Sequence, residues 1–156
     1  VSAVLTALQA EPGVSSYVYA RRIGSIIRAS NAIILFIQVG DTFIRKTPVQ
    51  TVSNTSDHSS AQTQAADIPT GIVAEAILRV AMTGSAAGQT LDVFPVDGTA
   101  GTGIGIVTSI GSGPLSRAEV RVLTNTSAQF KYQADSSAVD STINTVGWID
   151  PRGKDA

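Results

Sequence analysis

Hydrophobic residues follow a helical spacing only at the start of the chain. Val1, Val4, Leu5 and Leu8 recur at that spacing, and Pro12-Gly13 ends the pattern. We therefore predict a short N-terminal helix or stalk end over residues 1–13. A helix of about ten residues is marginal alone, so we expect it to dock on its own domain or on symmetry-related copies.

After this segment the pattern changes to the period of two that is typical of strands. Residues 17–23 alternate, and Ala32–Val39 is mostly apolar, which indicates a strand buried on both faces. Gly40-Asp41 predicts a turn, from which Thr42–Lys46 returns as a hairpin partner. Pro48 is expected to end that strand.

The middle of the chain gives weaker signals. The polar stretch Thr51–Asp67 predicts a loop or a weak edge strand, either a recognition loop or a solvated connection, and we favour the connection. Ile72–Met82 fits a helix and a strand equally well, because short apolar segments are ambiguous by period alone. Leu91–Val96 predicts a strand.

A glycine-rich stretch over Asp97–Gly105 is a candidate phosphate loop. Its glycines at 98, 101, 103 and 105 do not follow the G-x-G-x-x-G spacing of a dinucleotide loop, and no lysine follows as in a P-loop. We interpret it as a turn that leads into a strand over 104–110.

The last third of the chain has the cleanest alternation. Residues 117–123 and 129–134 flank the turn Asn125-Thr126-Ser127, which predicts an antiparallel hairpin with one solvated face. On that face we expect charges to pair across the strands, from Arg117, Glu119, Arg121 and Lys131. The final strand, Thr142–Ile149, contains Trp148, the single tryptophan and a core or interface anchor.

These elements together predict an all-β domain. About eight strands at a spacing of roughly 10–15 residues are typical of an antiparallel β-sandwich, here jelly-roll-like. We assign residues 14–156 to this single domain, preceded by the short N-terminal helix.

Composition narrows the function classes. The 156 residues are 43% hydrophobic but only 15% charged, with a net charge of −1 and no cluster of basic residues, so binding to nucleic acid or to an anionic membrane is disfavoured. No cysteine and a single histidine nearly exclude a zinc site, and we expect no metal or cofactor. The longest apolar run, Ala32–Val39, is far shorter than the roughly 20 residues that cross a bilayer.

Candidate catalytic residues are few. His58 lies between Asp57 and Ser59, but adjacent residues do not face one another as a Ser-His-Asp triad requires, so we expect a solvated loop histidine. Glycosidase chemistry needs two carboxylates about 5–10 Å apart. The candidate pairs have no aromatic sugar platform nearby in sequence: Asp92 with Asp97, and Asp135 with Asp140. We predict no catalytic residues and no enzyme activity.

Asn54-Thr55-Ser56 and Asn125-Thr126-Ser127 fit the glycosylation pattern, but we interpret both as turns.

Several segments resemble a known protein class. In order they are Tyr19–Ile26 (YARRIGSI), Phe36–Phe43 (FIQVGDTF), Lys46-Thr47-Pro48, Pro69-Thr70-Gly71 and Thr142–Gly153 (TINTVGWIDPRG). This order resembles the β-rich carboxy-terminal domains of tailed-phage tail fibres and related virion proteins, over roughly residues 17–153. The N-terminal helix is not part of the pattern.

The resemblance implies a homotrimeric virion domain at the tip of a fibre that contacts the host surface. Its partners would be other copies of itself, other phage virion proteins and a host glycan or lipopolysaccharide. The class offers no fixed receptor-binding residues to transfer to this chain. The alternative is a capsid decoration or head protein, whose apolar N-terminal segment would anchor to the shell. Either reading places the protein in the virion, on the tail or the capsid exterior.

Overall fold

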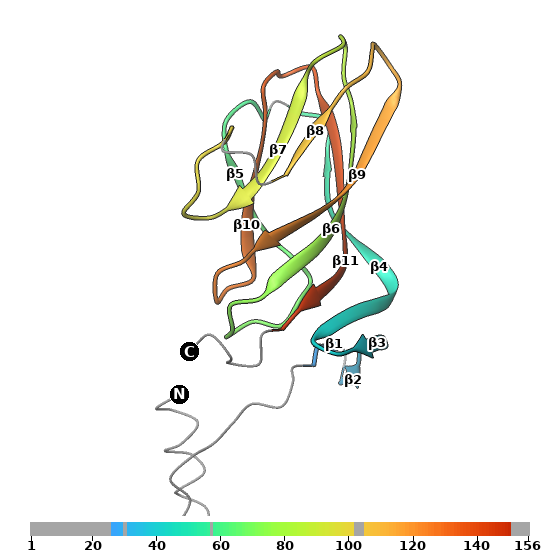
Figure 1. Ribbon diagram of the computed structural model, residues 1–156, viewed down its shortest axis with the longest axis vertical. Helices are drawn as coiled ribbons and strands as arrows, with labels where there is room; N and C mark the ends of the chain where they lie inside the picture. Colours follow the sequence, from blue (N-terminus) through green and yellow to red (C-terminus); the bar gives the residue numbers. More distant parts are fainter. Residues whose placement is uncertain (1–25, 30, 57, 102–104, 151–156) are drawn as a thin grey trace, which may run out of the picture.

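The protein is all-β over the residues described by the computed structural model, 26–29, 31–56, 58–101 and 105–150, and this part contains no helix. Two antiparallel sheets face each other around one core, the arrangement of a β-sandwich (Figure 1). The expected helix over 1–13, the strand over 17–23 and the domain boundary between 13 and 14 lie outside the described residues.

The larger sheet has five strands in the order β3-β4-β11-β6-β9. Their bounds are β3 (Phe36–Val39), β4 (Thr42–Asn54), β11 (Asp140–Ile149), β6 (Glu75–Thr83) and β9 (Leu115–Leu123). The smaller sheet has the order β5-β10-β7-β8, with β5 (Gln62–Ala65), β10 (Gln129–Ala134), β7 (Thr90–Pro95) and β8 (Ile106–Thr108). A third sheet pairs β1 (Arg28–Ala29) with β2 (Ala32–Ile33), at the end of the sandwich where β3 lies (Figure 1).

The core forms because alternate residues of each strand point inward. β6 and β11, at the centre of the larger sheet, bury nearly all of their inward side chains, and those of β7 and β10 pack against them. Trp148 is fully buried, and its ring stacks on Phe43 with centroids 5.0 Å apart. Phe36 meets both rings edge-on, at 5.4 and 5.7 Å. The prediction that Trp148 is a core anchor is confirmed.

The turn predicted at Gly40-Asp41, from which Thr42–Lys46 returns as a hairpin partner, is also confirmed: β3 pairs with the start of β4, and Gly40 has a φ of +60°. The expectation that Pro48 ends the second strand is wrong, since β4 continues to Asn54. The register between β4 and β11 jumps from Ile44↔Gly147 to Val49↔Thr145, so Pro48 lies in an irregular stretch of the ladder. Proline has no N–H to donate to a ladder, so it is tolerated in an irregular stretch such as this one.

The segment Ala32–Val39 is not a strand buried on both faces. It is split into β2 and β3, and four of its apolar side chains are more than half exposed: Ile33 (55%), Leu35 (66%), Ile37 (61%) and Val39 (69%). The cause is position, because β3 is the edge strand of the larger sheet and only Phe36 turns into the core.

The predicted hairpin between 117–123 and 129–134 is wrong, although both strands exist. β9 pairs with β6 in the larger sheet, whereas β10 pairs with β5 and β7 in the smaller one. The chain crosses between the sheets after Thr124, whose buried hydroxyl donates to the carbonyl of Ala74 at 2.9 Å. The expected pairing of Lys131 with the charges of β9 is therefore also wrong.

The ambiguous segments resolve as strands. Residues 72–82 contain most of β6, and the predicted strand 91–96 is confirmed as β7. The polar stretch 51–67 contains the end of β4 and an edge strand, β5, as one of the two predictions for it stated. Of the strand expected over 104–110, residues 106–108 form β8.

Candidate functional site

His58 is not a solvated histidine, as the sequence suggested, but fully buried. Its Nδ1 lies 2.7 Å from the carbonyl oxygen of Ser56, and its ring packs on Tyr132 with centroids 5.7 Å apart. The loop is fastened to β10, since the amide of Ala134 donates to the carbonyl of His58 at 3.0 Å. Its Nε2 is buried and has no hydrogen-bond partner among the described residues. Asp57, the neighbouring triad candidate, lies outside the described residues.

The four candidate carboxylates have different surroundings. Asp92 accepts a hydrogen bond from the amide of Gly101 at 2.6 Å, and so fastens the glycine-rich turn to β7. Asp97, Asp135 and Asp140 are exposed. The role of Asp92 is explained by the turn it holds.

Two predicted turns have the local side-chain bonds expected of them. Asn125 Oδ1 accepts from the amides of Ser127 at 3.0 Å and Gln129 at 2.9 Å. Asn54 Oδ1 accepts from the amide of Ser56 at 2.8 Å. Both asparagines therefore shape the backbone, as we predicted.

Neither a metal centre nor a membrane-spanning helix is found in the described part of the chain. No group of three or more histidine, aspartate or glutamate side chains gathers there. No helix among those residues is long and apolar enough to span a bilayer.

The outer face of the five-stranded sheet carries the most distinctive surface. Strand pairing places its outward residues in rows that run across the sheet. Two rows are mainly apolar: Arg121–Ile77–Gly147–Ile44–Ile37, and Leu123–Glu75–Ile149–Thr42–Val39. We call Ile37, Val39, Ile44, Leu123 and Ile149 the apolar half of this face. Ile37, Val39 and Leu123 are more than half exposed.

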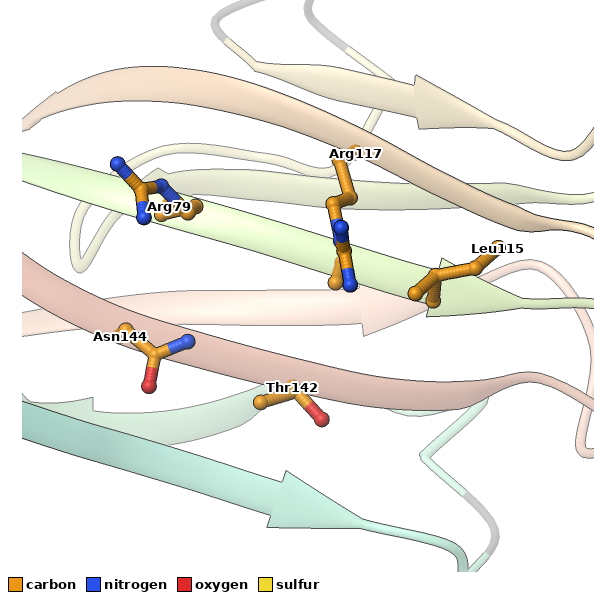
Figure 2. Close-up of a pocket in the computed structure, with 6 residues that line it drawn as sticks. Arg79, Leu115, Arg117, Thr142 and Asn144 are labelled. Atoms are coloured by element: carbon orange, nitrogen blue, oxygen red, sulfur yellow. The ribbon is translucent and has the colours of Figure 1, made fainter.

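The neighbouring rows form a polar groove. It has a volume of about 530 Å³ and is lined by three strands: Leu115 and Arg117 of β9, Arg79 and Ala81 of β6, and Thr142 and Asn144 of β11. Figure 2 shows Arg117 extending from β9 over β6, while Thr142 and Asn144 stand on β11. We call these six residues the polar groove.

Register and side-chain size together create this groove. Ala81 lies directly opposite Arg117 on one side and Thr142 on the other. Arg79 is opposite Asn144 in the next row. Because Ala81 ends at Cβ, the longer side chains around it form walls, and Ala81 forms the floor.

The groove presents unpaired positive charge. Within the described residues, neither the Arg79 nor the Arg117 side chain makes a hydrogen bond or an ion pair. Glu119 lies opposite Arg79 in the ladder but forms no ion pair with it, and Asp140 is exposed one row beyond Thr142. Two guanidinium groups on adjacent strands thus remain available to an anion.

Sequence reasoning did not find this groove. Arg117 was assigned to a solvated hairpin face, and Arg79 lay in a segment of undecided structure. Alternation along β6 and β9 shows that Arg79 and Arg117 each point to the polar side of their strand. It does not show that the two strands are neighbours, and the groove forms only when β9, β6 and β11 are aligned in register.

No family model matches the sequence, and no curated protein is significantly similar to it. Function is therefore inferred from the fold, from the two surfaces of the larger sheet and from the motif resemblance described above.

Proposed function

We propose that this chain is a structural protein of a tailed-phage virion: a homotrimeric tail-fibre domain that contacts the host cell surface. In this proposal it is a binding module and not an enzyme. The observation that carries the proposal is the juxtaposition, on one sheet face, of an exposed apolar half and an open polar groove.

The strand order supports a jelly roll within this proposal. From β4 to β11 the chain distributes eight strands equally between the two sheets, in the orders β4-β11-β6-β9 and β5-β10-β7-β8. Jelly rolls of eight strands are used by viral capsid proteins and lectins. Fold alone does not define function, so the proposal also depends on the apolar half and the polar groove.

The apolar half supports self-association. Ile37 and Val39 belong to β3, which within the described part of the chain is an edge strand paired with β4 alone. Exposed apolar edge strands readily pair with another chain, and contiguous apolar surface on a soluble protein marks an interaction site. A second copy of the same chain is the occupant we propose.

The polar groove supports contact with a surface glycan. Thr142 and Asn144 offer a hydroxyl and an amide, the groups that hydrogen-bond sugars, and the arginines add charge-assisted donors. The position of this groove beside the apolar half, rather than within it, is compatible with a domain that assembles and binds at the same time.

The mass of the protein in solution tests the assembly. Size-exclusion chromatography with light scattering at micromolar concentration should give three times 16.1 kDa, about 48 kDa. Ile37→Asp should dissociate the trimer because it places a charge in an apolar interface, with an unchanged far-UV circular dichroism spectrum. Thr63→Asp, an exposed position on β5 of the other sheet, is the matched control and should leave the mass unchanged. A monomeric wild-type protein contradicts the proposal.

Location within the particle tests the rest. Gold-labelled antibody against this chain should mark the tip of the tail in electron micrographs of the phage. Label on the capsid facets would instead establish the alternative, a head decoration protein. Incubation with host polysaccharide should yield no new reducing ends, and their appearance would overturn the non-enzymatic part of the proposal.

A further inference from the structure

We propose that the polar groove binds the carboxylate of an acidic saccharide, such as a uronic-acid unit of a surface polysaccharide. This inference rests on the proposed function only for the choice of a polysaccharide as the carrier of the carboxylate. The groove itself is a property of this chain and can be tested without a virion.

The two arginines of the groove carry positive charge that no described side chain neutralises. Arg79 and Arg117 are exposed and make no ion pair among the described residues, whereas Arg45 on the inner face of the same sheet pairs with Asp67 at 2.9 Å. The two arginines are diagonal neighbours on adjacent strands, since Arg117 is opposite Ala81 and Arg79 is opposite Glu119. Long side chains reach one another at this diagonal spacing, so one anion can contact both guanidinium groups.

The groove suits a carboxylate better than a phosphate. A guanidinium group presents a planar fork of donors that matches the two oxygens of a carboxylate. Glu119 and Asp140 lie on the same sheet face, in the rows on either side of the one that holds Arg117. They lower the positive potential of the groove, which disfavours a doubly charged phosphate more than a singly charged carboxylate.

The other residues of the groove are placed to contact the sugar that carries the carboxylate. Arg117 extends from β9 over β6 toward β11 (Figure 2), and Ala81 lies opposite it in the ladder, so a carboxylate on the groove floor would lie beside its guanidinium. Asn144 can donate to and accept from the ring hydroxyls of a sugar. Leu115, 49% exposed, offers an apolar wall to the C–H face of the ring. Arg79 supplies a second positive charge in the row beyond Ala81.

Titration calorimetry and NMR with trigalacturonate test this site, with neutral maltotriose and inorganic phosphate as comparison ligands. We expect trigalacturonate to bind, maltotriose not to bind, and phosphate to bind more weakly than trigalacturonate. Arg117→Gln should weaken binding about tenfold, as expected for the loss of a charge-assisted hydrogen bond. Arg117→Lys should recover only part of that loss, because it restores the charge without the fork. Arg79→Gln should also weaken binding.

Arg121→Gln is the matched control. Arg121 lies on the same face of β9 but four residues away from Arg117, opposite Ile77 in the apolar rows, and its loss should leave the affinity unchanged. Equal affinity of wild type and Arg117→Gln, equal binding of maltotriose, tighter binding of phosphate, or no binding of trigalacturonate at millimolar concentration would each overturn the inference.

The light-scattering mass of each variant separates this inference from the proposed function. If Arg117→Gln dissociates the trimer, the groove holds a neighbouring subunit and the saccharide site is refuted, while the assembly stands. If the protein is a monomer yet binds trigalacturonate through Arg117, the saccharide site stands and the trimeric fibre domain fails.

Discussion

Gly147→Ala is the substitution for which the structure makes the sharpest stability prediction. Gly147 faces Ile44 of β4 at the register shift of β11, and an added Cβ would overlap the carbonyl oxygen of Phe43. It would also come within 3.1 Å of the Cα of Ile44. These neighbours are backbone atoms, so no side-chain rotation relieves the overlap, and β4 must move away from β11.

The cost follows from what that movement disrupts. A displacement on the order of 1 Å stretches local ladder hydrogen bonds beyond the usual range of about 2.7–3.2 Å, and each contributes roughly 1 kcal/mol. It also disturbs the stacking of Trp148 on Phe43, since both residues adjoin the site; an aromatic pair contributes about 0.5–1.5 kcal/mol. We therefore expect a loss of about 3 kcal/mol, or a fall in Tm of roughly 6–12 °C for a chain of this size.

Thermal unfolding followed by circular dichroism and calorimetry measures this loss. Fluorescence of Trp148, the only tryptophan, reports the local packing. Gly111→Ala is the control, since its added Cβ would have Pro114 Cγ at 3.7 Å as its nearest contact, and it should change stability by less than about 0.5 kcal/mol. A Tm for Gly147→Ala within about 2 °C of wild type, with unchanged fluorescence, would refute the reasoning.

Three further substitutions test other parts of the fold by the same measurements. Gly105→Ala should destabilise the fold because its Cβ overlaps Val120 Cγ1. Val120→Ala removes that atom, so the double variant should lose less stability than the sum of the two single losses. Strict additivity of the two losses would contradict the overlap. Trp148→Ala should cost about 3–5 kcal/mol, since the side chain is fully buried, and a loss under about 1 kcal/mol would argue against its place in the core. Asp67→Asn should cost roughly 1 kcal/mol by weakening the ion pair to Arg45, a small effect because the Asp67 side chain is 39% exposed. That difference should shrink in about 1 M salt, and a salt-independent difference would rule out the ion pair as its cause.

The sequence predicted strands far better than it predicted their partners. Alternation identified β7, β10 and β11 because each turns one face to the core, and the turn at Asn125 was found because its side chain bonds the local backbone. Alternation states which residues share a face, not which sheet a strand joins. The short loop after β9 therefore suggested a hairpin, although it carries the chain from one sheet to the other.

Two errors at candidate sites share one physical cause. The apolar character of Ala32–Val39 predicts burial, but a sequence does not distinguish a face covered by its own chain from a face left open. The polar neighbours of His58 predict exposure, but the carbonyl of Ser56 and the ring of Tyr132 form a buried site for it. In both cases the position of the residue in the tertiary structure determines its solvent exposure, and local composition predicts that exposure wrongly.

The arrangement of the two proposed surfaces makes assembly and binding separable. The groove rows and the apolar rows share β6, β9 and β11, so a subunit docked on the apolar half would leave the groove at the rim of the interface. All six groove residues come from one chain, and none belongs to the apolar half. A monomer made by Ile37→Asp should therefore still bind trigalacturonate with the affinity of one wild-type site. If dissociation abolishes binding while the monomer stays folded, the neighbouring subunit contributes to the site, and the groove of a single chain is not sufficient to hold the saccharide.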